Sequence, residues 1–304
     1  MIPLRADILK TLLYYDIWNY PLKRTELFAY LPVNSMSYNE FARRLSDELQ
    51  TGDILERGEY YYVRGKTSAV VDHRISKERH ARRMWKVARI VMHVIKRVPF
   101  VRGVFVSGDL SKNATNRKSD LDFFIITEPG RLWITRTLLI AFKKVVLLNQ
   151  KKFFCLNYFA TTDCPVLETR NVFVATEVAH LKPLFNSRLF LEYQNTNSWI
   201  KEFFPNFHLS GSTGMRFPRV SDRRSYFQMV IEKLISVLPL DRMDDYLLRM
   251  MERVWARRYP EYDQTTRDRI FRCTKTESRA YVGNYEEKIL ALYRERLRMF
   301  GIGT

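Results

Sequence analysis

Apolar and polar residues follow two different periods in the first 67 residues of the chain. Apolar residues three and four apart predict helices, and short runs bounded by glycine predict strands. The helices are expected at 5–17, 23–31 and from Ser37 to Gly52, and the strands at 53–56 and 58–63. Ser37 and Glu40, three residues apart, have the spacing of a capping box. Three helices followed by a hairpin predict a winged-helix module over residues 1–67.

Residues 68–99 form a second unit, a basic linking helix expected over 72–97. Its apolar stripe repeats every three to four residues, and Pro99 ends it. The charged face has two interpretations. It is a solvated surface, which is the usual role of such a run, or a rim that attracts phosphates toward a neighbouring site. The run contains no motif of its own, so the first interpretation is favoured.

Two extended runs follow, 101–106 and 119–127, separated by Ser107-Gly108-Asp109 and a polar connector. Successive side chains of a strand point to opposite faces, so Asp120 and Asp122 project from the same face. The apolar residues that alternate with them point into a core. Two neighbouring carboxylates on a buried strand are costly unless a cation neutralises them, and Mg²⁺ prefers carboxylates and phosphate oxygens.

Gly108, followed twelve residues later by Asp120-Leu121-Asp122, resembles the signature of the DNA polymerase beta-type nucleotidyltransferase superfamily. In that signature a glycine-containing turn precedes Asp-x-Asp on a strand. The chain also resembles a bacterial branch of nucleotidyltransferase-domain proteins. The pieces that carry this second resemblance are Asp16–Leu22, Gly130–Arg136, Cys155–Phe159, Ala175–Ala179, Pro183-Leu184 and Asn197–Asn206. The similarity covers residues 10–206, and the last third of the chain matches no motif.

The resemblance implies an α+β fold with a mixed sheet, helices on one side of it and a metal site at its edge. Members transfer a nucleoside monophosphate from a nucleoside triphosphate to an acceptor hydroxyl and release pyrophosphate. Asp120 and Asp122 would then hold Mg²⁺ or Mn²⁺, and Gly108 would let the backbone approach the phosphates. The side chains that would contact the phosphates or the metal are Ser107, Ser111, Arg131 and Asn157. An ion pair with an acid is an equal alternative for Arg131.

Two residues depart from the superfamily pattern. Asp109 stands where serine or glycine is common, and a carboxylate there would repel a triphosphate unless it turns away or meets a cation. Asn157 stands on the strand expected over 153–160, where a third acid is common. Glu177 or Asp163 could substitute for that acid.

The resemblance places a nucleotidyltransferase catalytic domain at residues 100–186, which leaves 187–304 as a C-terminal domain. Apolar spacing predicts that this last part is mostly helical, over 226–238, 243–255 and 285–300. In related enzymes a helical region after the catalytic domain helps to shape the acceptor pocket. The residues that could line such a pocket here are Lys275, Arg279, Tyr281 and Tyr285.

The 304 residues include 51 Lys+Arg and 33 Asp+Glu, a formal charge of +18 that attracts polyanions. The excess is uneven, because residues 1–67 carry nine basic and nine acidic side chains whereas 68–99 carry nine and two. A neutral first module lacks the electrostatic footprint of a DNA-binding domain. We therefore favour a packing or protein-contact role for it.

Cysteine, histidine and hydrophobic patterns exclude several other classes of protein. Three cysteines cannot form a disulfide framework, and the five histidines lack the spacing of a zinc site. No apolar run reaches the ~20 residues of a membrane span, and no secretory signal begins the chain. We expect a cytoplasmic protein without a membrane partner.

The leading hypothesis is a Mg²⁺-dependent nucleotidyltransferase that uses a nucleoside triphosphate and an unknown acceptor. The acceptor could be a small molecule, a protein or an RNA. The alternative is a catalytically inactive nucleotidyltransferase-fold protein that binds nucleic acid as a regulator, which Asp109, Asn157 and the charge motivate. A protein-interaction scaffold is a third hypothesis, motivated by the neutral first module.

Overall fold

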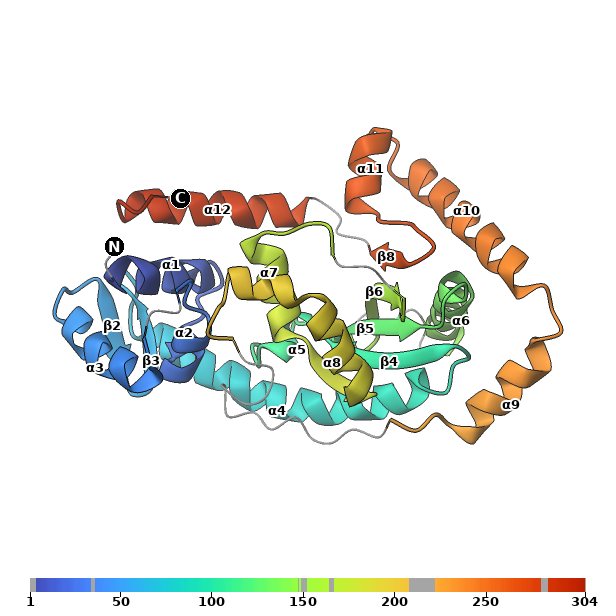
Figure 1. Ribbon diagram of the computed structural model, residues 1–304, viewed down its shortest axis with the longest axis horizontal. Coiled ribbons are helices and arrows are strands. Elements are labelled where there is room, and N and C mark those ends of the chain that lie inside the picture. Colours follow the sequence, from blue (N-terminus) through green and yellow to red (C-terminus); the bar gives the residue numbers. More distant parts are fainter. Residues whose placement is uncertain are drawn as a thin grey trace.

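Two β-sheets with helices around them form the part of the chain that the computed structural model describes (Figure 1). The described residues are 4–33, 36–146, 148, 152–163, 167–207, 222–279 and 284–303. This arrangement confirms the α+β fold class. None of the helices among these residues combines the length and the apolar composition that a bilayer-spanning segment needs.

The first module contains three helices and a small antiparallel sheet with the strand order β1-β3-β2. Its elements are α1 (Leu4–Asp16), β1 (Leu22–Lys23), α2 (Arg24–Ala29), α3 (Tyr38–Leu49), β2 (Ile54–Arg57) and β3 (Tyr60–Val63). The three predicted helices and the predicted hairpin are therefore present, and β1 is an additional short strand. Ser37 Oγ accepts the backbone N–H of Glu40 at 3.3 Å, as the capping-box spacing predicts.

The long basic helix is α4 (Ala69–Ile95), which has 27 residues and lies along one side of the central sheet (Figure 1). Its buried residues Ala81, Ala88, Met92 and Ile95 pack in the same core cluster as the sheet. Its exposed basic side chains are Arg79, Arg82, Arg83, Lys86 and Arg89.

The central sheet is mixed and has the strand order β7-β4-β5-β6-β8. Its strands are β4 (Val101–Val106), β5 (Asp122–Thr127), β6 (Cys155–Thr161), β7 (Lys182–Phe185) and β8 (Glu277–Arg279). The pair β5–β6 is parallel, and every other neighbouring pair is antiparallel. Because β4 runs opposite to β5 and β6, the end of β4 meets the beginnings of the other two strands.

Both faces of this sheet are covered by helices, whereas the superfamily resemblance implied helices on one side only. Alternation along β5 explains why: Phe123 and Ile125 pack with α4 and α6 (Leu132–Val145), and Phe124 and Ile126 belong to the opposite core. That opposite core includes α7 (Val172–His180) and α8 (Ser187–Thr196). The connector between β4 and β5 contains the short helix α5 (Gly108–Ser111).

Residues 187–304 are mostly helical, as expected, but they also complete other parts of the molecule. The remaining elements are η1 (Ser198–Glu202), α9 (Tyr226–Ile235), α10 (Leu240–Arg258), α11 (Gln264–Ile270) and α12 (Tyr285–Met299). The strand β8, which the sequence pattern did not reveal, pairs with β6. Helix α12 lies against α1 (Figure 1), where the Tyr293 hydroxyl donates to the Lys10 carbonyl at 3.2 Å.

A buried arginine joins the first module to α4. Arg74 is 1% exposed, and its guanidinium contacts Glu26 Oε1 at 2.9 Å and Glu78 Oε1 at 2.8 Å. Its Cζ atom also lies 3.6 Å from the centre of the Tyr20 ring. Burial lowers the pKa of Arg74 to about 10 and raises the pKa of Glu26 to about 7. Both groups have therefore given up hydration, which their mutual pairing and their other hydrogen bonds replace.

Removing this arginine tests how strongly the network holds the module. Arg74→Met leaves Glu26 and Glu78 buried without their partner, so we expect a loss of about 3–5 kcal/mol in the free energy of unfolding. Urea denaturation followed by circular dichroism measures it. The control is Arg57→Met, which breaks the exposed pair between Arg57 of β2 and Asp72 of α4 and should leave the midpoint unchanged. Equal midpoint shifts in both variants would contradict a special role for the buried network.

Candidate active site

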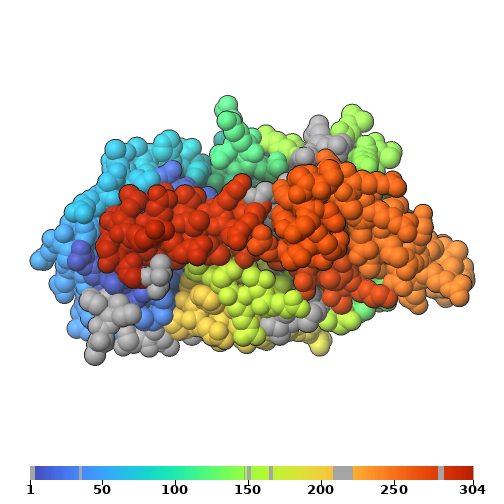
Figure 2. Space-filling view, turned by 90° about the horizontal axis from the view of Figure 1, so that it is seen from above, coloured from blue at the N-terminus to red at the C-terminus, as the bar shows by residue number. Residues whose placement is uncertain are grey.

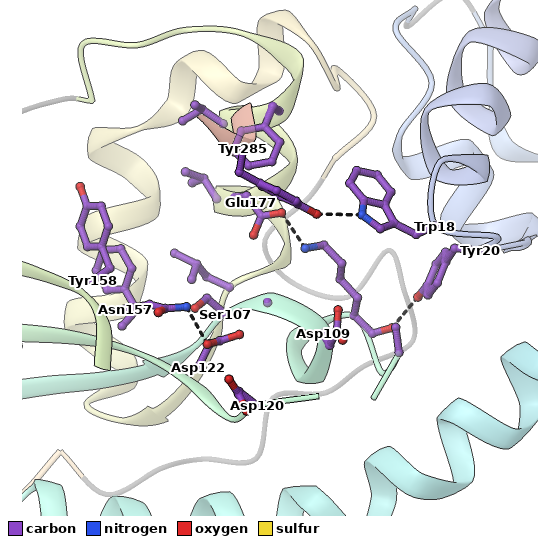
Figure 3. A pocket seen from close by; sticks show the side chains of 18 of the residues that line it. Trp18, Tyr20, Ser107, Asp109, Asp120, Asp122, Asn157, Tyr158, Glu177 and Tyr285 are labelled. Atoms are coloured by element: carbon purple, nitrogen blue, oxygen red, sulfur yellow. Dashed lines mark hydrogen bonds and ion pairs between the residues drawn. The ribbon is translucent and has the colours of Figure 1, made fainter. Parts of the chain in front are cut away.

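A cavity of ≈ 550 Å³ opens where β4 ends and β5 and β6 begin (Figure 3). This volume lies within the ~300–1,000 Å³ range of small-molecule sites. Its carboxylates are Asp109, Asp120, Asp122 and Glu177, and its basic residues are Lys77, Lys112 and Arg279. Its aromatic residues are Tyr15, Trp18, Tyr20, Phe124, Tyr158, Phe173, Tyr193 and Tyr285. The cavity thus combines acidic, basic and aromatic groups from every third of the chain.

The turn after β4 approaches the first residue of β5 very closely. The backbone N–H of Ser107 donates to the Asp122 carbonyl at 3.0 Å. Gly108 has φ +62°, and a Cβ atom added there would lie 2.3 Å from Asp122 Oδ2. Only glycine satisfies both conditions, since other residues rarely adopt this φ and their Cβ would collide with the carboxylate.

The two aspartates of the Asp-x-Asp motif both line the cavity, as alternation predicts (Figure 3). Leu121, between them, is buried on the other side of the sheet. The regular strand begins at Asp122 rather than at 119, although the backbone N–H of Leu121 already donates to the Lys152 carbonyl at 2.8 Å. The motif therefore lies at the entrance of the strand, where its carboxylates reach the cavity.

Asn157 reaches the same place through a bulge in β6. Phe123 pairs with Leu156 and Phe124 pairs with Tyr158, so Asn157 has no partner in the register. A bulge re-aims a side chain in this way. Asn157 Nδ2 donates to Asp122 Oδ1 at 2.6 Å. The residue thus occupies the expected third position, but as a neutral hydrogen-bond donor to Asp122.

Burial makes Asp122 the most perturbed carboxylate of the cavity. Desolvation is the main cause that raises its pKa from 3.8 to about 7, and the negative charges of Asp109, Asp120 and Glu177 raise it further. A group of acids at such close quarters is stabilised by a bound cation. The site is therefore electrostatically suited to a metal ion.

Asp109 does not stand free in front of the cavity. Ser119 Oγ donates to Asp109 Oδ2 at 2.6 Å, and the positive charge of Lys77 acts on Asp109. Lys77 itself lines the cavity, and burial lowers its pKa. The carboxylate that departs from the superfamily pattern thus has a hydroxyl donor and a neighbouring cation, which reduces its repulsion of an anion.

Two residues expected at the phosphates lie elsewhere. Ser111 is 1% exposed, and its hydroxyl donates to the Gly108 carbonyl at 2.8 Å instead of lining the cavity. Arg131 follows the far end of β5, a strand of six residues and about 20 Å. There it pairs with Asp241 and lies 5.8 Å from the centre of the Phe100 ring. The ion-pair alternative for Arg131 is the one that the structure contains.

Cys155 has no nucleophilic role in this cavity. Its thiol donates to Asn157 Oδ1 at 3.1 Å, and burial with the nearby Asp122 raises the pKa of Cys155 to about 12. The sulfur therefore stays protonated at neutral pH. Cys155 and Cys273 are free thiols, and Cys164 lies outside the described residues.

The opposite wall of the cavity combines Glu177 and Tyr285, which the sequence singled out, with Lys112, Trp18 and Tyr20, to which it assigned no role in the site. Lys112 Nζ lies 2.7 Å from Glu177 Oε1, and the Tyr20 hydroxyl donates to the Lys112 carbonyl. Trp18 Nε1 donates to the Tyr285 hydroxyl at 3.0 Å (Figure 3). This last bond joins the turn after α1, in the first module, to the start of α12. Trp18 and Tyr20 were missed because they lie about 100 positions before the motif.

Two of the four residues proposed for an acceptor pocket line the cavity. Arg279 and Tyr285 line the cavity. Lys275 lies 2.9 Å from Asp245 and does not line it, and Tyr281 is outside the described residues. Asp163, one substitute for the third acid, is exposed and outside the lining, whereas Glu177, the other, is in it.

The donor set fits a hard divalent cation. Asp120, Asp122 and Ser107 bring oxygen ligands to one end of the cavity, and Mg²⁺ commonly binds through one or two carboxylates plus substrate oxygens. No group of three or more His, Cys, Asp or Glu side chains converges as metal ligands among the described residues. The arrangement therefore suits a metal that enters with a phosphate ligand better than an all-protein metal site.

Comparison of the chain with protein-family models, with curated proteins and with solved structures finds no match. A functional assignment for this chain therefore depends on the geometry and the chemistry of the cavity.

The close approach of Gly108 to Asp122 can be tested with two glycines of nearly equal φ. Gly108→Ala should cost more than the ~1–2 kcal/mol of a positive φ, because the new methyl group displaces the Asp122 carboxylate. Gly58, with φ +63° and nothing within 4 Å of an added Cβ, is the matched control. Urea denaturation measures both variants. The same loss for Gly58→Ala and Gly108→Ala would refute the contact.

The raised pKa of Asp122 predicts a pH-dependent cost to stability in the metal-free protein. Between about pH 4 and pH 7 the unfolded chain releases this proton while the folded chain keeps it, so stability falls as the pH rises and levels off above pH 7. Asp122→Asn removes the titration. We expect a higher melting temperature than the parent at pH 8 in EDTA, and a difference that closes toward pH 4.

Melting curves across this pH range, with Asp241→Asn as an exposed control, provide the check. A parent and an Asp122→Asn variant that melt in parallel at every pH would show that Asp122 titrates normally.

Proposed function

We propose that the protein is a Mg²⁺- or Mn²⁺-dependent nucleotidyltransferase that transfers a nucleoside monophosphate to an acceptor hydroxyl. The observation that carries the proposal is the contact between the Gly108 turn and Asp122, with Asp120 beside it in a cavity of ≈ 550 Å³. Glycine at this contact and the two carboxylates are the features that the superfamily signature would require. The metal and the triphosphate follow from the chemistry of the donor set.

In this proposal Asp120 and Asp122 hold the cation, and Asn157 orients Asp122 through its 2.6 Å hydrogen bond. When bound, the metal neutralises the triphosphate and polarises the oxygens around the α-phosphorus. Gly108 leaves room for the phosphates next to the backbone. Lys77 and Lys112 line the same cavity and supply positive charge to it.

In this proposal the aromatic wall of the cavity holds the base of the nucleotide. Phe124 and Tyr158 stack with centroids 4.3 Å apart, and Trp18 and Tyr285 lie on another side of the same cavity. With Asp120 and Asp122 at the cation, the cavity carboxylates left are Asp109 and Glu177, and we assign to Glu177 the role of accepting the proton of the acceptor hydroxyl. The acceptor oxygen then bonds to the α-phosphorus, and the bond from that phosphorus to the pyrophosphate breaks.

Calorimetric titration with each nucleoside triphosphate in Mg²⁺ tests the metal role. The Asp120→Asn, Asp122→Asn double variant should bind ~100-fold or more weakly than the parent, since even outer-shell groups contribute ~10–100-fold to metal sites. Arg131→Ala is the control, because Arg131 lies outside the cavity. Binding that is equal in the parent and the double variant would remove both aspartates from the site.

Turnover needs a separate measurement, release of pyrophosphate and transfer of α-³²P label to a component of a cell extract. The parent should transfer label, and the double variant should not. The labelled component then identifies the acceptor as a small molecule, a protein or an RNA.

A second candidate function is favoured by Asn157 and by α4. The neutral Asn157 leaves the site with two carboxylates at this end of the cavity, and the exposed arginines and lysine of α4 form no ion pair within the described part of the chain. A regulator that binds nucleotide without turnover and holds nucleic acid on α4 would combine these features. It predicts saturable triphosphate binding, no pyrophosphate, and nucleic-acid affinity that falls steeply with salt.

A further inference from the structure

Helix α9 (Tyr226–Ile235) buries its polar side and exposes its apolar side, the reverse of an ordinary surface helix. Such a helix normally turns its apolar stripe to the core and its polar side to solvent. In α9 the buried side is polar: Gln228 is 0% exposed and donates from Nε2 to the carbonyls of Val98 at 3.0 Å and Val101 at 2.8 Å. The apolar side faces outward.

A second polar residue of α9 holds the helix in this orientation. Glu232 accepts the backbone N–H of Phe100 at 2.6 Å and pairs with Arg102 at 2.8 Å. Ile235 packs from the same side against a small apolar cluster. Because Gln228 and Glu232 are committed to these bonds, the helix cannot rotate its apolar side inward without breaking both Gln228 hydrogen bonds and the Glu232–Arg102 pair.

The outward side is mainly apolar, with the exposed Lys233 at one border of its stripe. At ~100° per residue, Tyr226, Phe227, Val230, Leu234 and the following Val237 fall within an arc of about 100°. Their exposures include 78% for Tyr226, 68% for Leu234 and 84% for Val237. Met229 and Leu238 flank them and are also exposed. We define these seven residues as the α9 face.

The area of the α9 face indicates what covers it. Weighted by exposure, its side chains present roughly 750 Å² to solvent, taking ~150–250 Å² for a large side chain. The largest apolar patch of a typical monomer is ~300–600 Å². A stable complex buries about 800 Å² on each partner. One further helix face of the same kind would therefore match it.

We infer that the α9 face is a two-fold interface between two copies of this chain. The helix lies at one end of the molecule (Figure 1), and residues 226–258 lie at that end in the perpendicular view (Figure 2). A two-fold axis next to α9 would bring the α9 faces of the two copies into contact with each other. Two-fold symmetry is the commonest symmetry of soluble oligomers. The cavity lies away from this end, so the inference stands independently of the proposed function.

Sedimentation velocity at about 5–50 µM tests the inference directly. The parent should sediment with twice the chain mass of 36.4 kDa. Leu234→Glu should sediment as a monomer, because it puts two carboxylates near the axis. Ile90→Glu is the matched control: Ile90 is 67% exposed on α4, nearly the same as Leu234, and its variant should remain a dimer.

Val237→Glu, which lies beyond the end of α9, provides a second disrupting variant should Leu234→Glu fail to fold, and circular dichroism reports the folding of both. A parent that is monomeric throughout this range, or a folded Leu234→Glu that stays dimeric, would overturn the inference. Flotation with vesicles of phosphatidylcholine and phosphatidylglycerol tests the alternative that the α9 face binds a membrane surface. A monomeric parent that floats, and loses flotation in Leu234→Glu, would assign the face to a membrane surface instead.

Discussion

The backbone of Gly108 lies against the carboxylate of Asp122, and the arrangement of the candidate site depends on that contact. One hydrogen bond, from the Ser107 N–H to the Asp122 carbonyl, fixes the turn after β4 to the first residue of β5. The close approach is possible because Gly108 has no side chain. Both strands continue from this point into two separate cores, so the contact is held from behind by packing on each face of the sheet. The carboxylate thereby gains a fixed position beside open space, which is what a ligand site requires.

This position has an electrostatic cost that the fold tolerates. Asp122 is surrounded by the charges of Asp109, Asp120 and Glu177 and is removed from water, and both effects raise its pKa. The fold offsets part of the cost by local pairing, of Asp109 with Ser119 and of Glu177 with Lys112. Asp122 itself has the neutral amide of Asn157 as its partner. A buried acid that lowers the stability of the folded protein is typical of a functional site, where a bound ligand supplies the missing interactions.

The position of the neutral first module, next to the cavity and to α4, is consistent with its lack of net charge. It presents Trp18 and Tyr20 to the cavity and is fastened to α4 by Arg74, whose guanidinium stacks on Tyr20 and pairs with Glu26. Its charges are thus used inside the molecule rather than against a polyanion. A packing role, favoured from its zero net charge, agrees with this placement, whereas the outer side of α4 exposes five basic side chains.

The α+β class was expected from the superfamily resemblance. Local pattern was sufficient for the helices of the first module, the long basic helix and the shared face of Asp120 and Asp122, because spacing along one element decides each of them. It did not reveal β8, the bulge that aims Asn157, the remote place of Arg131 or the aromatic wall. The inverted orientation of α9 was equally hidden. These features depend on contacts between segments that are far apart in the chain. The energies of such contacts produce no periodic pattern of residues, so the sequence alone does not reveal them.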